Sequence, residues 1–149
     1  MKTICGADCT VCERKAACNG CEATGGRPFG GKCLAAEYIK VGGKAAFDEF
    51  KQQLLSEINA LGIAGMPEIK ELYCLCGSFV NLAYPLADGT TVKFLDDSRI
   101  YLGAQAECLF AEGEDADRCF GLVADADFLL VCQYSKGGEN PELLLYKKR

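Results

Sequence analysis

Six cysteines lie within the first 33 residues of this chain, and their sulfur atoms are the groups best suited to chemistry. They follow the pattern C-G-x-x-C-x-x-C, then C-x-G-C, then one further cysteine: Cys5, Cys9, Cys12, Cys18, Cys21 and Cys33. The chain contains no His, so a Ser-His or Cys-His nucleophile is excluded. Closely spaced thiols without His favour a metal site built of thiolates alone.

Two C-x-x-C pairs, Cys9/Cys12 and Cys18/Cys21, can supply the four ligands of a tetrahedral zinc ion. Only five residues separate the two pairs, which is short for a zinc ribbon. Cys33 or Cys5 is therefore an alternative ligand, and two zinc ions sharing all six thiolates is another arrangement. We predict a structural zinc site drawn from these six cysteines.

Iron–sulfur and thiol-redox chemistry are the alternatives to zinc. The spacing of Cys5, Cys9 and Cys12 copies that of radical enzymes with a four-iron cluster, but those enzymes are barrels of about 200 residues or more. All-thiolate sites suit iron as well as zinc. A redox C-x-x-C usually begins a helix that follows a strand, and neither pair here has a preceding strand. We therefore favour a non-catalytic zinc protein over an iron–sulfur or thiol-redox protein.

Composition and charge restrict the compartment and the partner. The first residues lack the apolar segment of a signal peptide, and no apolar run approaches the roughly 20 residues of a membrane span. We therefore expect a cytoplasmic protein without a membrane segment, in which disulfides do not persist. Residues 45–149 carry nine basic and seventeen acidic side chains, which disfavours broad nucleic-acid binding. The expected partner is a protein, which the sequence does not identify.

The N-terminal 35 residues resemble a family of small prokaryotic cysteine-rich proteins of unknown function. Members begin with C-G-x-x-C-x-x-C, continue to C-x-G-C and add a cysteine downstream, as do Cys5-Gly6, Cys9, Cys12, Cys18-Asn-Gly-Cys21 and Cys33 here. Many members have a longer insert after the third cysteine, which this chain lacks. The resemblance implies a zinc-binding module and supplies no established activity.

One long helix and two short helices are predicted after the cysteine-rich segment. Phe47, Phe50, Leu54, Ile58 and Leu61 form one apolar stripe at helical spacing, and Gly62 follows as a stop signal. A short helix is predicted over residues 32–41, ended by Gly42-Gly43. Another is predicted from Pro67 to about Tyr73, because proline suits the first helical position.

The remainder of the chain has the pattern of strands joined by short turns. Strands are predicted over residues 79–86, 91–94, 100–102, 118–123, 128–134 and 143–146, with Asp88-Gly89 as a hairpin turn. The predicted fold class is α+β: a cysteine-rich metal-binding head, one or two helices, and an antiparallel sheet of about five strands. The head is assigned to residues 1–43 and the helix and sheet to residues 44–149, together forming one compact unit.

The five remaining cysteines have simpler interpretations. Cys119 and Cys132 lie in strand patterns and are expected to be buried as small apolar residues. Cys74 and Cys76 are two residues apart, which in an extended chain places both on one face. An approach to the metal is the alternative for this pair, although core thiols are favoured. Cys108 lies beside a loop and indicates nothing specific.

The head is predicted to depend on metal for its order. Its large apolar side chains are few, and their burial at roughly 25 cal/mol per Å² cannot offset about 1–2 kcal/mol of backbone entropy per residue. A structural zinc ion contributes an apparent ~10–16 kcal/mol. Chelation under reducing conditions should therefore remove hydrogen-exchange protection from residues 1–33 and leave 128–134 protected. Joint loss in both segments, or a head that stays protected without metal, would contradict this prediction.

Overall fold

The computed structural model describes residues 3–12, 15–18, 20–76, 83–109 and 117–149, without the side chains of Leu75 and Cys76. Its elements in chain order are α1 (Leu34–Asn59), β1 (Tyr73–Cys76), β2 (Tyr84–Pro85), β3 (Thr91–Val92), β4 (Ile100–Glu107), β5 (Arg118–Ala124), β6 (Phe128–Ser135) and β7 (Glu142–Lys148). Turns and bends make up the described part of the head that precedes Cys33.

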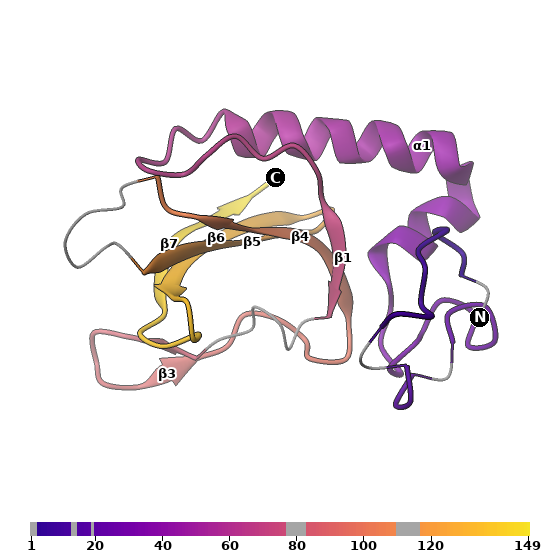
Figure 1. Ribbon diagram of the computed structural model, residues 1–149, viewed down its shortest axis with the longest axis horizontal. Coiled ribbons are helices and arrows are strands. Elements are labelled where there is room, and N and C mark those ends of the chain that lie inside the picture. The colour runs from indigo at the N-terminus through magenta and orange to yellow at the C-terminus, as the bar shows by residue number, and fades with distance from the viewer. Residues whose placement is uncertain (1–2, 13–14, 19, 77–82, 110–116) are drawn as a thin grey trace.

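The sheet is antiparallel and has five strands in the order β1-β4-β5-β6-β7. In Figure 1 helix α1 lies along one side of the sheet, the small β2–β3 hairpin lies on the other side, and the N-terminal head stands beside β1. The described residues therefore confirm the predicted α+β class with an antiparallel sheet of five strands.

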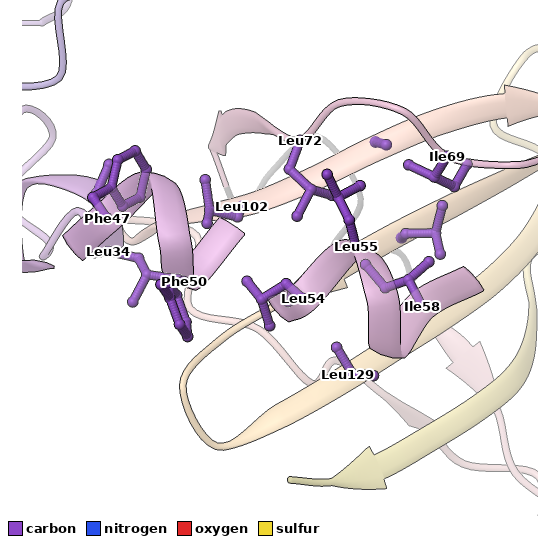
Figure 2. Close-up of a cluster of buried hydrophobic side chains, with 14 of the residues drawn as sticks. Leu34, Phe47, Phe50, Leu54, Leu55, Ile58, Ile69, Leu72, Leu102 and Leu129 are labelled. Carbon is purple, nitrogen blue, oxygen red and sulfur yellow. The ribbon is translucent and has the colours of Figure 1, made fainter. Parts of the chain in front are cut away.

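The predicted apolar stripe packs α1 onto the sheet. Phe47, Phe50, Leu54 and Ile58 are buried, and Leu54 has no exposed surface. Figure 2 shows these side chains facing Leu102 of β4 and Leu129 of β6. A second apolar cluster, centred on Tyr84, Tyr101 and Leu130, fills the space between the opposite face of the sheet and the hairpin. Burial on both faces fixes the register of the central strands.

Gly43 bends α1 instead of ending it. The sequence predicts two helices separated by Gly42-Gly43, whereas α1 runs through both glycines with a non-helical conformation at Gly43 (φ 82°, ψ 175°). The rings of Tyr38 and Phe50 stack with centroids 3.9 Å apart. In a straight helix, residues twelve positions apart would lie about 18 Å apart along the axis. The bend therefore folds the first helical segment back toward the second.

The short helix predicted from Pro67 to Tyr73 is wrong. Residues 67–72 are not helical, and Tyr73 begins strand β1. The Asn59 side chain at the end of α1 accepts a hydrogen bond from the Ile69 N–H and donates one to the Ile69 carbonyl, each at 2.9 Å. These bonds satisfy the Ile69 backbone without a helix, and they guide the chain back along the sheet toward β1.

The strand predictions agree with the sheet except at its first strand. β4 to β7 form where the sequence predicts strands, and β4 is longer than expected. Asp88-Gly89 makes the turn between β2 and β3, closed by the Leu86 N–H to Thr90 carbonyl bond at 2.8 Å. Half of the strand predicted over residues 79–86 lies outside the described residues, and β2 (Tyr84–Pro85) falls in the other half. Strand β1 was not predicted, and its first residue, Tyr73, was expected to end the short helix.

Backbone contacts join the head to the start of β4. The Ile100 N–H donates to the Lys32 carbonyl at 3.0 Å, and Cys33 forms an isolated parallel bridge with Ile100. Gly31 approaches the turn before β4 so closely that a Cβ at this position would lie 2.3 Å from the backbone carbon and oxygen of Ser98. Only glycine fits at this contact.

Gly31→Ala should therefore destabilise the fold. Overpacking typically costs about 1–3 kcal/mol, so the free energy of unfolding in urea should fall by that amount. Gly137→Ala is the control, because nothing lies within 4 Å of a Cβ there. A change within about 0.5 kcal/mol is expected for the control. Equal stability of the two variants would show that the approach to Ser98 is not needed.

Candidate metal centre

Three segments that are distant in the sequence bring thiols together where the head meets the sheet. Cys5 comes from the N-terminal turns, Cys33 immediately precedes α1, and Cys74 lies in β1. The Cys74 thiol is within hydrogen-bonding reach of the sulfur atoms of both Cys33 and Cys5. Each of the ten cysteines whose side chains are described is a free thiol.

The β1–β4 register explains the position of Cys74. Cys74 is paired with Leu102, and directly opposed residues of antiparallel strands place their side chains on the same face. Leu102 belongs to the apolar cluster beneath α1, so Cys74 lies on the helix side of the sheet. Cys33 is bridged to Ile100, two residues earlier in β4. Strand β4 is therefore the scaffold that holds these two cysteines near each other.

Hydrogen bonding among these thiols separates their pKa values. Cys74 acts as the donor, and its pKa is raised by its bonds to Cys33 and Cys5 and by the burial of its sulfur, although the residue as a whole is exposed. The bond from Cys74 lowers the pKa of Cys5 to about 5 and that of Cys33 to about 7. Two of the three thiols are thus prepared to be thiolates, the form that binds metal.

Backbone amides add to this effect at Cys33 and Cys5. Cys33 is the N-cap residue of α1, where helical N–H groups favour negative charge. Its sulfur makes no regular capping hydrogen bond, yet the nearby amides of Ala36 and Ala35 contribute to its lowered pKa. The Ala7 amide acts in the same direction on Cys5. The turn around Cys5 is closed by the Thr3 hydroxyl, which donates to the Ala7 carbonyl at 2.8 Å.

Cys21 is the fourth thiol at this junction. The Gly26 N–H donates to the Cys21 carbonyl at 2.7 Å, and the Cys33 N–H donates to the Gly26 carbonyl at 3.1 Å. Cys21 is buried, and burial raises its pKa, with the negative charges of Cys33 and Cys5 acting in the same direction. An interaction with the Ile4 amide opposes that rise. We call Cys5, Cys21, Cys33 and Cys74 the junction thiols.

The other three predicted ligands are Cys9, Cys12 and Cys18. A turn closes the first C-x-x-C pair, with the Cys12 N–H donating to the Cys9 carbonyl at 3.3 Å. The Gly20 N–H donates to the sulfur of Cys18 at 3.4 Å. Burial and the neighbouring Cys12 and Cys5 raise the pKa of Cys9. Cys12 itself is exposed, whereas Cys9 and Cys18 are half-buried.

The junction thiols are of the ligand type that zinc prefers. Their sulfur atoms are not arranged around a common centre. Across the described residues, no three metal-ligating side chains are arranged so that they could hold one ion. Zinc–sulfur bonds of about 2.3 Å place the sulfurs of a tetrahedral site about 3.8 Å apart, which is close to the spacing of thiols in contact.

The structure separates the predicted ligands that contact Cys74 from those that do not. It also brings in Cys74, which the sequence analysis did not count among the ligands. Cys5 and Cys33 contact Cys74 directly. Cys21 interacts electrostatically with Cys33 and Cys5, and Cys9 interacts with Cys5, Cys12, Cys18 and Cys21. Cys74 was expected to be a core thiol, and it instead contacts two of the predicted ligands. Its C-x-C spacing with Cys76 was the available signal. Cys132 is buried as expected, and Cys119 and Cys108 are half-buried.

Comparisons with protein-family models, curated proteins and solved structures find no match to this chain. The likeness of its cysteine pattern to the small prokaryotic family therefore stays a prediction. Within the described residues, no helix has the length and apolar character needed to cross a membrane.

Thiol labelling should report the order of pKa values at the junction. Where the junction is folded in metal-free, reduced protein at pH 7, Cys5 is above its pKa of about 5 and is a thiolate, whereas Cys74 keeps its proton. A head that melts without metal, as predicted above, would instead give the two thiols similar rates. Because the thiolate is the nucleophile, Cys5 should react with a short pulse of iodoacetamide before Cys74. Its rate should fall as the pH drops through about 5.

Peptide mass spectrometry would measure both rates, and the same pulse in urea serves as the control. Unfolding separates the thiols, so the two rates should become similar. Faster labelling of Cys74 than of Cys5 in the folded protein would contradict the assignment of Cys74 as the donor.

Proposed function

We propose that this chain is a non-catalytic zinc-binding protein whose thiolate site holds the head in place and so presents a surface to a protein partner. The observation that carries the proposal is the contact of Cys74 with both Cys5 and Cys33. Three separate segments supply these thiols, and a bound zinc ion would link the segments through sulfur–metal bonds.

A zinc ion explains the contact of Cys74 with both Cys5 and Cys33 better than a disulfide does. One disulfide can join only two of the three contacting thiols, and the third would remain buried beside it. The lowered pKa values of Cys5 and Cys33 favour the ionised form that a metal ligand requires. The absence of His from the sequence leaves sulfur as the ligand type of choice for zinc in the head.

The proposed partner surface is the outer side of the head. Val11, inside the first C-x-x-C pair, is 81% exposed, and Val41 of α1 is 92% exposed. Residues 1–44 carry seven basic and four acidic side chains, in contrast to the acidic remainder. Exposed apolar side chains within a basic segment are suited to contact with a protein that carries complementary acidic groups.

An iron–sulfur or thiol-redox protein is the second candidate. The lowered pKa of Cys5 next to the thiol of Cys74 favours it, because a thiolate with a neighbouring thiol is the arrangement used in disulfide exchange. Against it, Cys5 lies among turns and not at the start of a helix that follows a strand. Metal content and colour separate the two candidates.

Protein purified without oxygen should be colourless and contain zinc. Elemental analysis should find zinc in the wild type and little in the double variant Cys5→Ser/Cys33→Ser. The double variant Cys108→Ser/Cys119→Ser is the matched control, because it removes two thiols outside both groups and should keep its zinc. A brown preparation with visible iron–sulfur absorption and acid-labile sulfide would favour the second candidate, and a metal-free colourless protein would contradict both metal assignments.

A further inference from the structure

We infer that the metal is bound across the boundary between head and sheet, by Cys74 of β1 together with Cys5, Cys21 and Cys33. This inference rests on the proposed zinc-binding function and goes beyond the six ligands that the sequence predicts. It replaces a site contained within the head by one that takes a ligand from the edge strand of the sheet.

Backbone geometry brings Cys74 and Cys33 to the same place. Strand β4 pairs with β1 through Leu102 and Cys74, and it pairs with the head through Ile100 and Cys33. The 3.0 Å bond from the Ile100 N–H to the Lys32 carbonyl and the close approach of Gly31 to Ser98 fix the head at this position. Figure 1 shows β1 at the side of the sheet that faces the head.

Ionic contacts reinforce the same junction. Arg99, immediately before β4, lies 3.3 Å from Glu37 of α1 and 3.4 Å from Asp125 in the turn between β5 and β6. The first helical segment is therefore tied to two parts of the sheet. Cys33 directly precedes that segment, and its sulfur contacts the thiol of Cys74.

Cys5 and Cys21 complete a set of four. Cys21 and Cys33 are 8% and 4% exposed, and Cys5 packs against the same apolar cluster as these two. The Gly26 backbone joins Cys21 to Cys33 through two hydrogen bonds. Four thiolates are the ligand set of a closed structural zinc site, and two of these four cysteines, Cys21 and Cys33, are buried. Cys9, Cys12 and Cys18 are left outside this set, because no contact within the described part of the chain joins them to Cys74 as contacts join Cys5 and Cys33 to it.

Direct detection of metal–cysteine coupling would test this assignment. The native metal is exchanged for ¹¹³Cd, and a ¹¹³Cd–¹H correlation spectrum identifies each cysteine whose β-protons couple to the ion. We expect couplings from Cys5, Cys21, Cys33 and Cys74. A spectrum that includes Cys74 supports the inference whatever other cysteines it contains. Couplings confined to Cys5–Cys33 would overturn it and leave the proposed function intact.

Metal affinity gives an independent readout. Cys74→Ser should weaken zinc binding, measured by competition with a chromophoric chelator, by at least the ~10–100-fold seen when groups outside the ligand shell are changed. Cys108→Ser is the matched control and should retain wild-type affinity. An unchanged affinity in Cys74→Ser would overturn the inference. If Cys74→Ser does not fold, the wild-type spectrum decides, and a wild type that binds no metal would overturn the proposed function together with this assignment.

Discussion

The burial of the apolar stripe of α1 against β4 and β6 is the interaction on which the rest of the structure depends. Leu54 and Ile58 are almost completely enclosed, and this packing fixes where both ends of the helix lie. At its start, the bend at Gly43 directs the chain toward the first residues of β4. At its end, Asn59 binds Ile69 and returns the chain to β1. Cys33 and Cys74 meet because these two ends are set by one packing surface.

Much of this fold follows from local sequence patterns. The stripe from Phe47 to Ile58 repeats with helical spacing, and Asp88-Gly89 is a strong hairpin signal, so both could be predicted without knowledge of distant contacts. The bend at Gly43 and the extended segment after Pro67 could not. The first depends on the stacking of Tyr38 on Phe50, and the second on the side chain of Asn59. Both interactions come from residues outside the local window.

The candidate site shows the same division between local and distant information. A dense run of cysteines can be recognised in the sequence alone, so Cys5, Cys21 and Cys33 were predicted to be metal ligands. The pattern gave no means to separate them from Cys9, Cys12 and Cys18, because only the fold shows which cysteines approach Cys74. Cys74 was underrated because its proximity to Cys33 arises only through the register of β1 and β4.

The position of β1 at the edge of the sheet has a consequence for association between molecules. An edge strand presents unpaired N–H and C=O groups that can template pairing with another chain. β1 pairs with β4 on one side only, and in Figure 1 the head stands beside β1 on the side away from the other strands. The head therefore acts as a cap that limits access to this edge. A cysteine-rich segment that adds little apolar burial of its own thus contributes to keeping the sheet from growing by one more strand.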